Sequence, residues 1–126
     1  MNKNTIIAFD LDDVLCKRPA YVNNLGKKKY EYCKPIKKNI KILNNLYNDG
    51  FKIVIFSSRG MTYYEANIKK IKKNLLKLTE NQLKSWEVKY HTLVMGKIHY
   101  DLFIDDRAIN SEKLNYKKIL KKIKEL

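Results

Sequence analysis

Aspartates are crowded at two places in a chain that is otherwise strongly basic. Asp10, Asp12 and Asp13 lie in the stretch FDLDDVLC, and Asp105 and Asp106 lie in FIDD, so two short segments hold five of the seven aspartates. Neighbouring carboxylates repel one another until protons or a cation offset their charge. Hard oxygen ligands of this kind favour Mg²⁺, which commonly joins protein carboxylates to a substrate phosphate. The two clusters therefore predict a Mg²⁺ site, provided that the fold brings them together.

Other polar groups of the sequence suit the binding of phosphate. Ser57, Ser58 and Arg59 follow the apolar run FKIVIF, and Lys97 follows HTLVMG. Arginine and lysine bind phosphate oxygens through charge-assisted hydrogen bonds. A carboxylate can itself attack phosphorus and form an aspartyl-phosphate. Together with the aspartates, these residues predict a site for phosphoryl transfer.

Short apolar runs precede each of these polar groups. TIIAFDL, FKIVIF, HTLVM and DLFID have the composition of strands that are buried on both faces of a parallel sheet. Between and after them, apolar residues recur at helical spacing. One such helix is expected from Pro35 to Gly50, a second is expected to be capped by Thr62, a third to begin at Thr79, and a fourth to span residues 111–126. This alternation predicts α/β architecture: a doubly wound, Rossmann-like parallel sheet with helices on both faces.

In sheets of this type, ligands bind beyond the carboxyl ends of the strands. Four segments that are far apart in the sequence are therefore expected to deliver polar side chains to one edge. They contribute Asp10 and Asp12, then Ser57 to Arg59, then Lys97, and finally Asp105 and Asp106.

At this point the residues resemble those of a known superfamily. FDLDDVLC is similar to the first motif of the haloacid dehalogenase (HAD) superfamily, an apolar run followed by DxDx[TV]. The serine after FKIVIF, the lysine of GKIHYD and the FIDD pair resemble the other three motifs, in the same order. The resemblance runs from Ile6 to about Ile109. Within the superfamily, the short length, the SSRGM turn and YDLFIDDRAIN most resemble a small bacterial family of capsule-biosynthesis phosphatases.

The resemblance implies a role for each catalytic residue. Asp10 resembles the nucleophile, and Asp12 resembles the general acid/base that protonates the departing alcohol and then activates water. Lys97 and Ser57 resemble the groups that hold the phosphoryl oxygens while charge is redistributed. Arg59, directly after the serines, is expected to touch the substrate, and Ser58 is the alternative to Ser57.

The resemblance also implies the ligands of Mg²⁺. These are the carboxylate of Asp10, the backbone carbonyl of Asp12 and the carboxylate of Asp105. Asp106 is expected to bind the ion through water or to orient Lys97. Arg18, His99 and Arg107 lie close to these motifs in the sequence, and their roles stay open.

The intervals between motifs leave no room for a large cap domain. We therefore expect residues 1–126 to form a single HAD-like phosphatase domain, with a flap or hairpin at about residues 16–34 beside an open site. A homo-oligomer is compatible with this expectation, because a neighbouring subunit would help to close the site.

The charge of the chain allows more than one kind of substrate. The formal net charge is +14, but 24 of the 27 basic residues are lysines, as expected for a compositional bias that fills the solvated surface. On this interpretation the enzyme hydrolyses a small phosphorylated metabolite, in particular a sugar phosphate of surface-polysaccharide biosynthesis. The alternative is a phosphatase that acts on nucleic-acid ends bearing a 3′-phosphate and uses the positive charge for binding. Two alternatives without catalysis remain. A phospho-receiver domain would need an acceptor aspartate where this chain has Ser57 and Ser58, and a basic binding module would leave the aspartate clusters unexplained.

The sequence also bears on compartment. No apolar run approaches the ~20 residues that span a bilayer, and the first residues lack the apolar core of a signal peptide. Cys16 and Cys33 fit no metal or redox spacing, so we expect reduced thiols in a cytoplasmic protein without a membrane partner.

Overall fold

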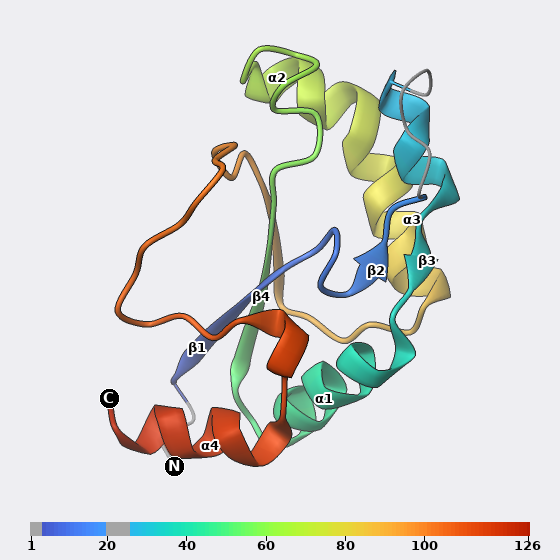
Figure 1. Ribbon diagram of the computed structural model, residues 1–126. Helices are drawn as coiled ribbons and strands as arrows, with labels where there is room; N and C mark the ends of the chain where they lie inside the picture. The colour runs from blue at the N-terminus through green and yellow to red at the C-terminus, as the bar shows by residue number, and fades with distance from the viewer. Residues whose placement is uncertain (1–3, 20–25) are drawn as a thin grey trace.

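A three-stranded parallel sheet forms the centre of the computed structural model, which describes residues 4–19 and 26–126 (Figure 1). Its strands are β1 (Ile6–Asp10), β4 (Lys52–Ser57) and β5 (Thr92–Met95), in the order β1-β4-β5. Asp10 pairs with Phe56 and Ser57 pairs with Met95, so the three carboxyl ends lie at one edge of the sheet. The predicted α/β parallel architecture is confirmed.

The segment after β1 contains a short antiparallel pair that forms a separate, two-stranded sheet. β2 (Cys16–Lys17) pairs with β3 (Lys34–Pro35), and the 3₁₀ helix η1 (Gly26–Tyr32) lies between them in the sequence. Because Pro35 is paired with Cys16 in this ladder, helix α1 (Lys37–Asn48) begins two residues later than expected. The predicted flap spans residues 16–34, of which residues 20–25 lie outside the described part of the chain.

The two helices expected after β4 form one continuous helical stretch. It comprises α2 (Ile68–Ile71), a π-helical turn η2 (Lys72–Leu76) and α3 (Lys77–Ser85). The cap is Asn67, whose side chain accepts a hydrogen bond from the backbone N–H of Lys70, and not Thr62. Residues 58–67 instead form turns, which carry the residues next to the site.

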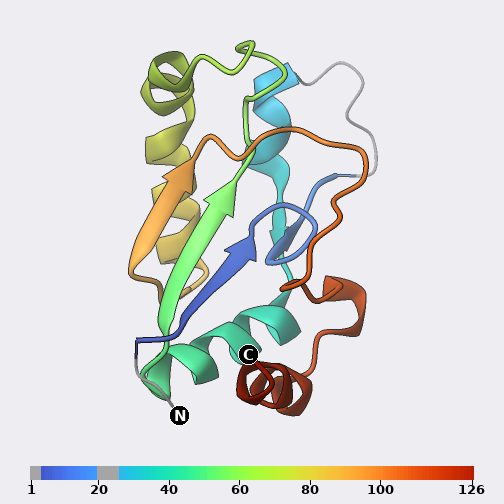
Figure 2. The ribbon, with the colours of Figure 1, turned by 90° about the vertical axis from the view of Figure 1, so that its left-hand side faces the viewer.

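The faces of the sheet are covered unequally. Helix α1 and the stretch from α2 to α3 lie against one face, and α4 (Tyr116–Lys124) lies on the other, near the start of the strands (Figures 1 and 2). A short 3₁₀ turn, η3 (Ser111–Lys113), precedes α4. The alternation along β4 follows from this: Ile53, Ile55 and Ser57 are fully buried, whereas Phe56 on the opposite face is 37% exposed. No helix of the described residues is long and apolar enough to cross a membrane.

The prediction of a fourth strand at DLFID is wrong. In the structure, residues 101–105 belong to a long connection between β5 and η3 that forms no ladder with the sheet and passes beyond the carboxyl ends of the strands (Figure 2). Leu102 and Ile104 are 78% and 88% exposed. A short apolar run indicates that a segment is hydrophobic but does not specify a pairing partner, and here the run extends past the sheet without one.

Candidate active site

The carboxyl ends of β1 and β5 bring Asp10 and Lys97 together. The Nζ of Lys97 lies 2.9 Å from Oδ2 of Asp10, and it also bonds to the hydroxyl of Tyr100 at 3.1 Å. The other carboxylate oxygen of Asp10 accepts a hydrogen bond from the backbone N–H of Leu11. The lysine is positioned by its own backbone, because the N–H groups of Gly96 and Lys97 both donate to the carbonyl of Ser57.

Lys97 keeps its positive charge in this position. Burial on its own lowers the pKa of Lys97, but the hydrogen bonds to Asp10 and Tyr100 and the charge of Asp10 raise it by more, so the net shift is upward. The ammonium group is therefore available to neutralise phosphate oxygens at neutral pH.

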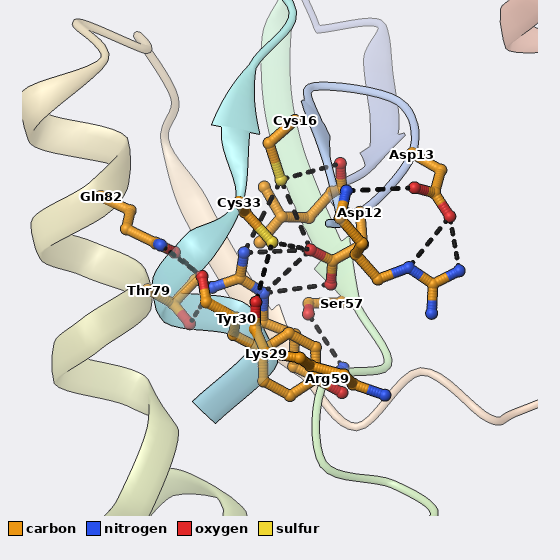
Figure 3. Close-up of polar contacts among 12 residues, drawn as sticks. Asp12, Asp13, Cys16, Lys29, Tyr30, Cys33, Ser57, Arg59, Thr79 and Gln82 are labelled. Atoms are coloured by element: carbon orange, nitrogen blue, oxygen red, sulfur yellow. Dashed lines mark hydrogen bonds and ion pairs between the residues drawn. The ribbon is translucent and has the colours of Figure 1, made fainter. Parts of the chain in front are cut away.

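Asp12 is held by a buried arginine, as Figure 3 shows. Nε and Nη2 of Arg59 lie 3.0 Å from the two carboxylate oxygens of Asp12, and Nη1 donates to Thr79 Oγ1 and Gln82 Oε1 at 3.1 and 2.6 Å. The guanidinium group also lies 5.0 Å from the centre of the Tyr30 ring. Arg59 is only 1% exposed, although it borders the site cavity.

The charges and hydrogen bonds of the Arg59–Asp12 pair restrict the position of the Asp12 carboxylate. Burial alone lowers the pKa of Arg59, but the charge and hydrogen bonds of Asp12 outweigh this effect and raise it. A forked guanidinium that binds both carboxylate oxygens restricts the orientation of Asp12. Contact between Arg59 and the substrate, which the sequence led us to expect, stays a prediction; the structure gives this residue a set of protein partners.

Two thiols also face Asp12. The Sγ atoms of Cys16 and Cys33 lie 3.4 and 3.5 Å from Oδ1 of Asp12, and both cysteines are free and buried. The hydrogen bond with Cys33, burial and the charge of Asp12 together raise the pKa of Cys16 well above its usual value, so it stays a thiol. Among the described residues, Asp12, Cys16 and Cys33 form a group whose ligand atoms lie within 4.8 Å of one another. Soft sulfur ligands are unsuited to Mg²⁺, and the Arg59 guanidinium already neutralises this carboxylate.

Of the two serines, Ser58 reaches the cavity beside Asp10. Ser57 is fully buried, and its hydroxyl accepts a hydrogen bond from the backbone N–H of Arg59 at 3.1 Å. Ser58 is half-buried and borders the cavity. The choice between the two as phosphate ligand is thus shifted toward Ser58, and Ser57 shapes the turn that carries it.

The site opens into a cavity of about 600 Å³. Its lining includes Asp10, Asp12, Arg18, Ser58, Lys97 and Tyr63. Arg18 is partly exposed and pairs with Asp13, with Nη2 2.5 Å from Oδ2. His99 also borders this cavity.

The second aspartate cluster, Asp105 and Asp106, is less closely associated with the site than the first. Asp105 and Asp106 are both exposed, because the strand expected to end at them does not form. Asp105 nevertheless borders a second cavity, of about 770 Å³, that Asp10 and Arg107 also line. The structure thus places Asp10 and Asp105 on one cavity, and Asp106 is solvent-exposed on the same connection.

Sequence reasoning missed several partners of Asp12 and of Arg59. Cys16 follows Asp12 by four residues, which is a visible signal of proximity, but Cys33, Tyr30, Thr79 and Gln82 come from distant segments. Nothing in the spacing of these residues indicates that they surround one guanidinium group.

Comparisons with known proteins agree with this fold. A family profile described as polynucleotide kinase 3 phosphatase matches residues 5–95. The crystal structure of a target protein from Vibrio cholerae is similar over 96% of this chain and 98% of that one, with 28% identity and a TM-score of 0.78. A chain in the structure of a Pnkp1/Rnl/Hen1 complex aligns with 83% of this chain at 19% identity and a TM-score of 0.50, and the aligned part is 31% of that longer chain. A search of curated proteins gave no match.

A family match of this extent identifies a phosphatase, a phosphoric monoester hydrolase, and the parallel sheet with acidic residues beyond β1 is consistent with a HAD-like core. Within this class, the chain belongs to the polynucleotide kinase 3 phosphatase family, because the match covers well over half of its length. The narrower resemblance to capsule-biosynthesis phosphatases is not supported by the match. The matched residues include Asp10, Asp12 and Arg59, whereas Lys97 and Asp105 lie beyond them.

The buried arginine gives the first testable prediction. Replacing Arg59 by lysine (Arg59→Lys) keeps the positive charge but removes the guanidinium group with its several N–H donors. Acceptor atoms of Asp12, Thr79 and Gln82 are then left without a donor. We expect a loss on the order of 2–3 kcal/mol in the free energy of unfolding, measured by urea denaturation. The matched control is Arg18→Lys, whose aspartate pair is partly exposed and is worth less than about 0.5 kcal/mol. Equal losses in the two variants would show that the Arg59 network does not stabilise the fold.

Proposed function

We propose that this phosphatase removes 3′-phosphate groups from the ends of polynucleotides through an aspartyl-phosphate intermediate and with the help of Mg²⁺. The observation that carries the proposal is the match to the polynucleotide kinase 3 phosphatase family across the segment that holds Asp10, Asp12 and Arg59. The open cavity beside Asp10 supports it, since none of the elements in the described part of the chain forms a separate cap domain over this carboxylate.

In the first step, a carboxylate oxygen of Asp10 attacks the phosphorus atom. A bond forms between that oxygen and phosphorus, the ester bond to the 3′ oxygen breaks, and Asp12 gives its proton to the departing oxygen. Lys97, which lies 2.9 Å from Asp10, and Ser58 hold the phosphoryl oxygens in this step. Their positive charge and hydrogen bonds stabilise the charge that spreads over these oxygens.

In the second step, Asp12 takes a proton from water, and the resulting hydroxide attacks the phosphorus atom of the aspartyl-phosphate. The bond to Asp10 breaks, which releases inorganic phosphate and restores the carboxylate. Arg59 binds both oxygens of Asp12 and so fixes the orientation of this carboxyl group toward the water.

The chain offers hard oxygen donors for a Mg²⁺ ion, but among the described residues Asp10 and Asp105 do not belong to a group of three or more ligands close enough to bind one ion. Asp10 and Asp105 supply hard oxygen atoms to one cavity, and the backbone carbonyl of Asp12 follows Asp10 by two residues. Asp106 would bind through water. When bound, the ion would neutralise the phosphate and raise the electrophilicity of its phosphorus atom.

Exchanging the nucleophile tests the mechanism. Asp10→Asn should lower kcat by roughly 10³-fold or more, because an amide cannot form the aspartyl-phosphate. Asp12→Asn should slow hydrolysis of the intermediate, so that phosphate from labelled substrate stays on the protein. The control is Asp101→Asn, an exposed acid-to-amide change outside both cavities, which should keep full activity. Full activity of a folded Asp10→Asn variant would refute the mechanism.

Removal of the metal gives the next prediction. EDTA should abolish turnover and added Mg²⁺ should restore it, because the carboxylates alone repel an anionic substrate. In Asp105→Asn the Mg²⁺ concentration for half-maximal activity should rise about tenfold or more, as is usual when a metal site is weakened. An enzyme that stays active in EDTA, or an unchanged Mg²⁺ requirement in Asp105→Asn, would argue against this assignment.

A second candidate substrate is a small phosphorylated metabolite such as a sugar phosphate. The specific observation in its favour is that the cavity of about 600 Å³ is large enough for a whole small molecule. On this alternative the lysine-rich surface is only solvated.

Salt dependence separates the two candidates. An oligonucleotide 3′-phosphate bound through two backbone phosphates should lose roughly tenfold in kcat/KM between about 50 and 200 mM salt, because binding releases counterions. A sugar phosphate should show a much smaller dependence. Turnover of sugar phosphates with oligonucleotides left intact would replace the first candidate by the second.

A further inference from the structure

The rim of the site cavity carries an exposed aromatic side chain with no evident role in the chemistry. Tyr63 is 62% exposed and borders the same cavity as Asp10, Asp12 and Lys97. An aromatic ring left in water beside a polar site forgoes the stabilisation that burial would bring. Tyr63 therefore stands out as a surface for a ligand.

Other tyrosines at this cavity have partners that occupy them. Tyr30 is buried, with its ring against Arg59 and its hydroxyl accepting from the backbone N–H of Gly60. Tyr100 bonds to Lys97, and its ring packs against Phe103 at 5.1 Å. Tyr63 differs from both in presenting most of its ring to the solvent.

Backbone hydrogen bonds stabilise the loop that carries Tyr63. After β4, Tyr64 N–H donates to Gly60 O and Ala66 N–H donates to Met61 O, both at 2.8 Å. Glu65 and Ala66 have φ values of 51° and 60°, in the left-handed region that side chains other than glycine seldom adopt. Such strain persists where the surrounding contacts determine the backbone, and it is concentrated at ligand sites.

The ring of Tyr63 also packs against a neighbouring aromatic ring of the protein. Tyr63 meets Tyr64 edge to face, with 4.8 Å between ring centres and 77° between planes. Tyr64 in turn packs against the hydrophobic core. The ring of Tyr63 is therefore already oriented at the mouth of the cavity, so little conformational entropy is lost when a planar ligand stacks on it.

We infer that Tyr63 is a stacking subsite for the base of the terminal nucleotide, whose 3′-phosphate is bound at Asp10. This inference rests on the proposed function. Every base has an aromatic face, so such a subsite accepts all sequences. The base of an unpaired end is free to adopt the orientation that the ring of Tyr63 requires, so unpaired ends should be preferred to paired ones.

The experiment compares two substrates that differ only in the terminal base. One is a single-stranded oligonucleotide with a 3′-phosphate and an ordinary last nucleotide, and the other has an abasic last nucleotide. Tyr63→Ala should raise KM for the first about tenfold with little change in kcat, in line with the usual contribution of one stacked base. Tyr63→Phe, which keeps the ring, should restore the KM of the original enzyme.

The abasic substrate should show a raised KM with the unaltered enzyme and no further increase in Tyr63→Ala. The matched control is Tyr32→Ala, because Tyr32 is also largely exposed, at 57%, but does not border the cavity. This variant should behave as the unaltered enzyme does on both substrates. Thermal unfolding of each variant checks that the fold is kept.

A binding measurement gives an independent readout. The Asp10→Asn protein, which binds without turnover, is titrated with an oligonucleotide 3′-phosphate whose last base is 2-aminopurine. Stacking should quench the fluorescence of that base. The quenching should be lost in the double variant that carries both Asp10→Asn and Tyr63→Ala.

The outcomes separate the inference from the proposed function. Turnover of oligonucleotide 3′-phosphates with equal KM for ordinary and abasic ends, or with an unchanged KM in Tyr63→Ala, would overturn the stacking subsite and leave the phosphatase assignment standing. An enzyme that hydrolyses only small phosphomonoesters would overturn both.

Discussion

A buried positive charge governs the arrangement of the site. Arg59 is removed from water almost completely, and the loss of its hydration has to be offset by partners inside the protein. Asp12 supplies the opposite charge, whereas Thr79 and Gln82 accept the remaining N–H groups. The loop after β1 and helix α3 are therefore held at a fixed distance from the turn after β4. The same contacts that satisfy the arginine give Asp12 its orientation toward the cavity.

A second ion pair gives Asp10 an environment that differs from that of Asp12. Asp10 faces Lys97 at the edge of the cavity, where the lysine is partly accessible and can exchange a carboxylate for a phosphate. Asp12 faces Arg59, which is buried and has too many protein partners to leave. Two carboxylates separated by one residue thus have different environments, one open to a substrate and one anchored. This difference suits a nucleophile and a proton-transfer group.

The three strands of the sheet and the residues at their ends were predictable, because buried parallel strands have continuous apolar sequences and their carboxyl ends share one edge. That reasoning brought Asp10 and Lys97 together across 87 residues of sequence. It failed for residues 101–105, where the apolar pattern is strand-like but carries no information on a partner. It also missed the burial of Arg59, since the groups around it lie 20 to 47 residues away and each is an ordinary polar residue in isolation. Local patterns predict elements, whereas the satisfaction of a buried charge depends on tertiary contacts.

The outer edge of β1 has a consequence for handling the protein. Among the described strands, β1 pairs with β4 only, and its residues line one cavity together with Phe103 and Asp105 of the connection after β5. Unpaired strand edges are templates for intermolecular β-pairing, and a covering segment is one way in which proteins prevent it. Deletion or proteolytic cutting of this connection would uncover both the edge and the apolar side chains along it. Such a shortened chain should aggregate at concentrations at which the intact chain stays dispersed.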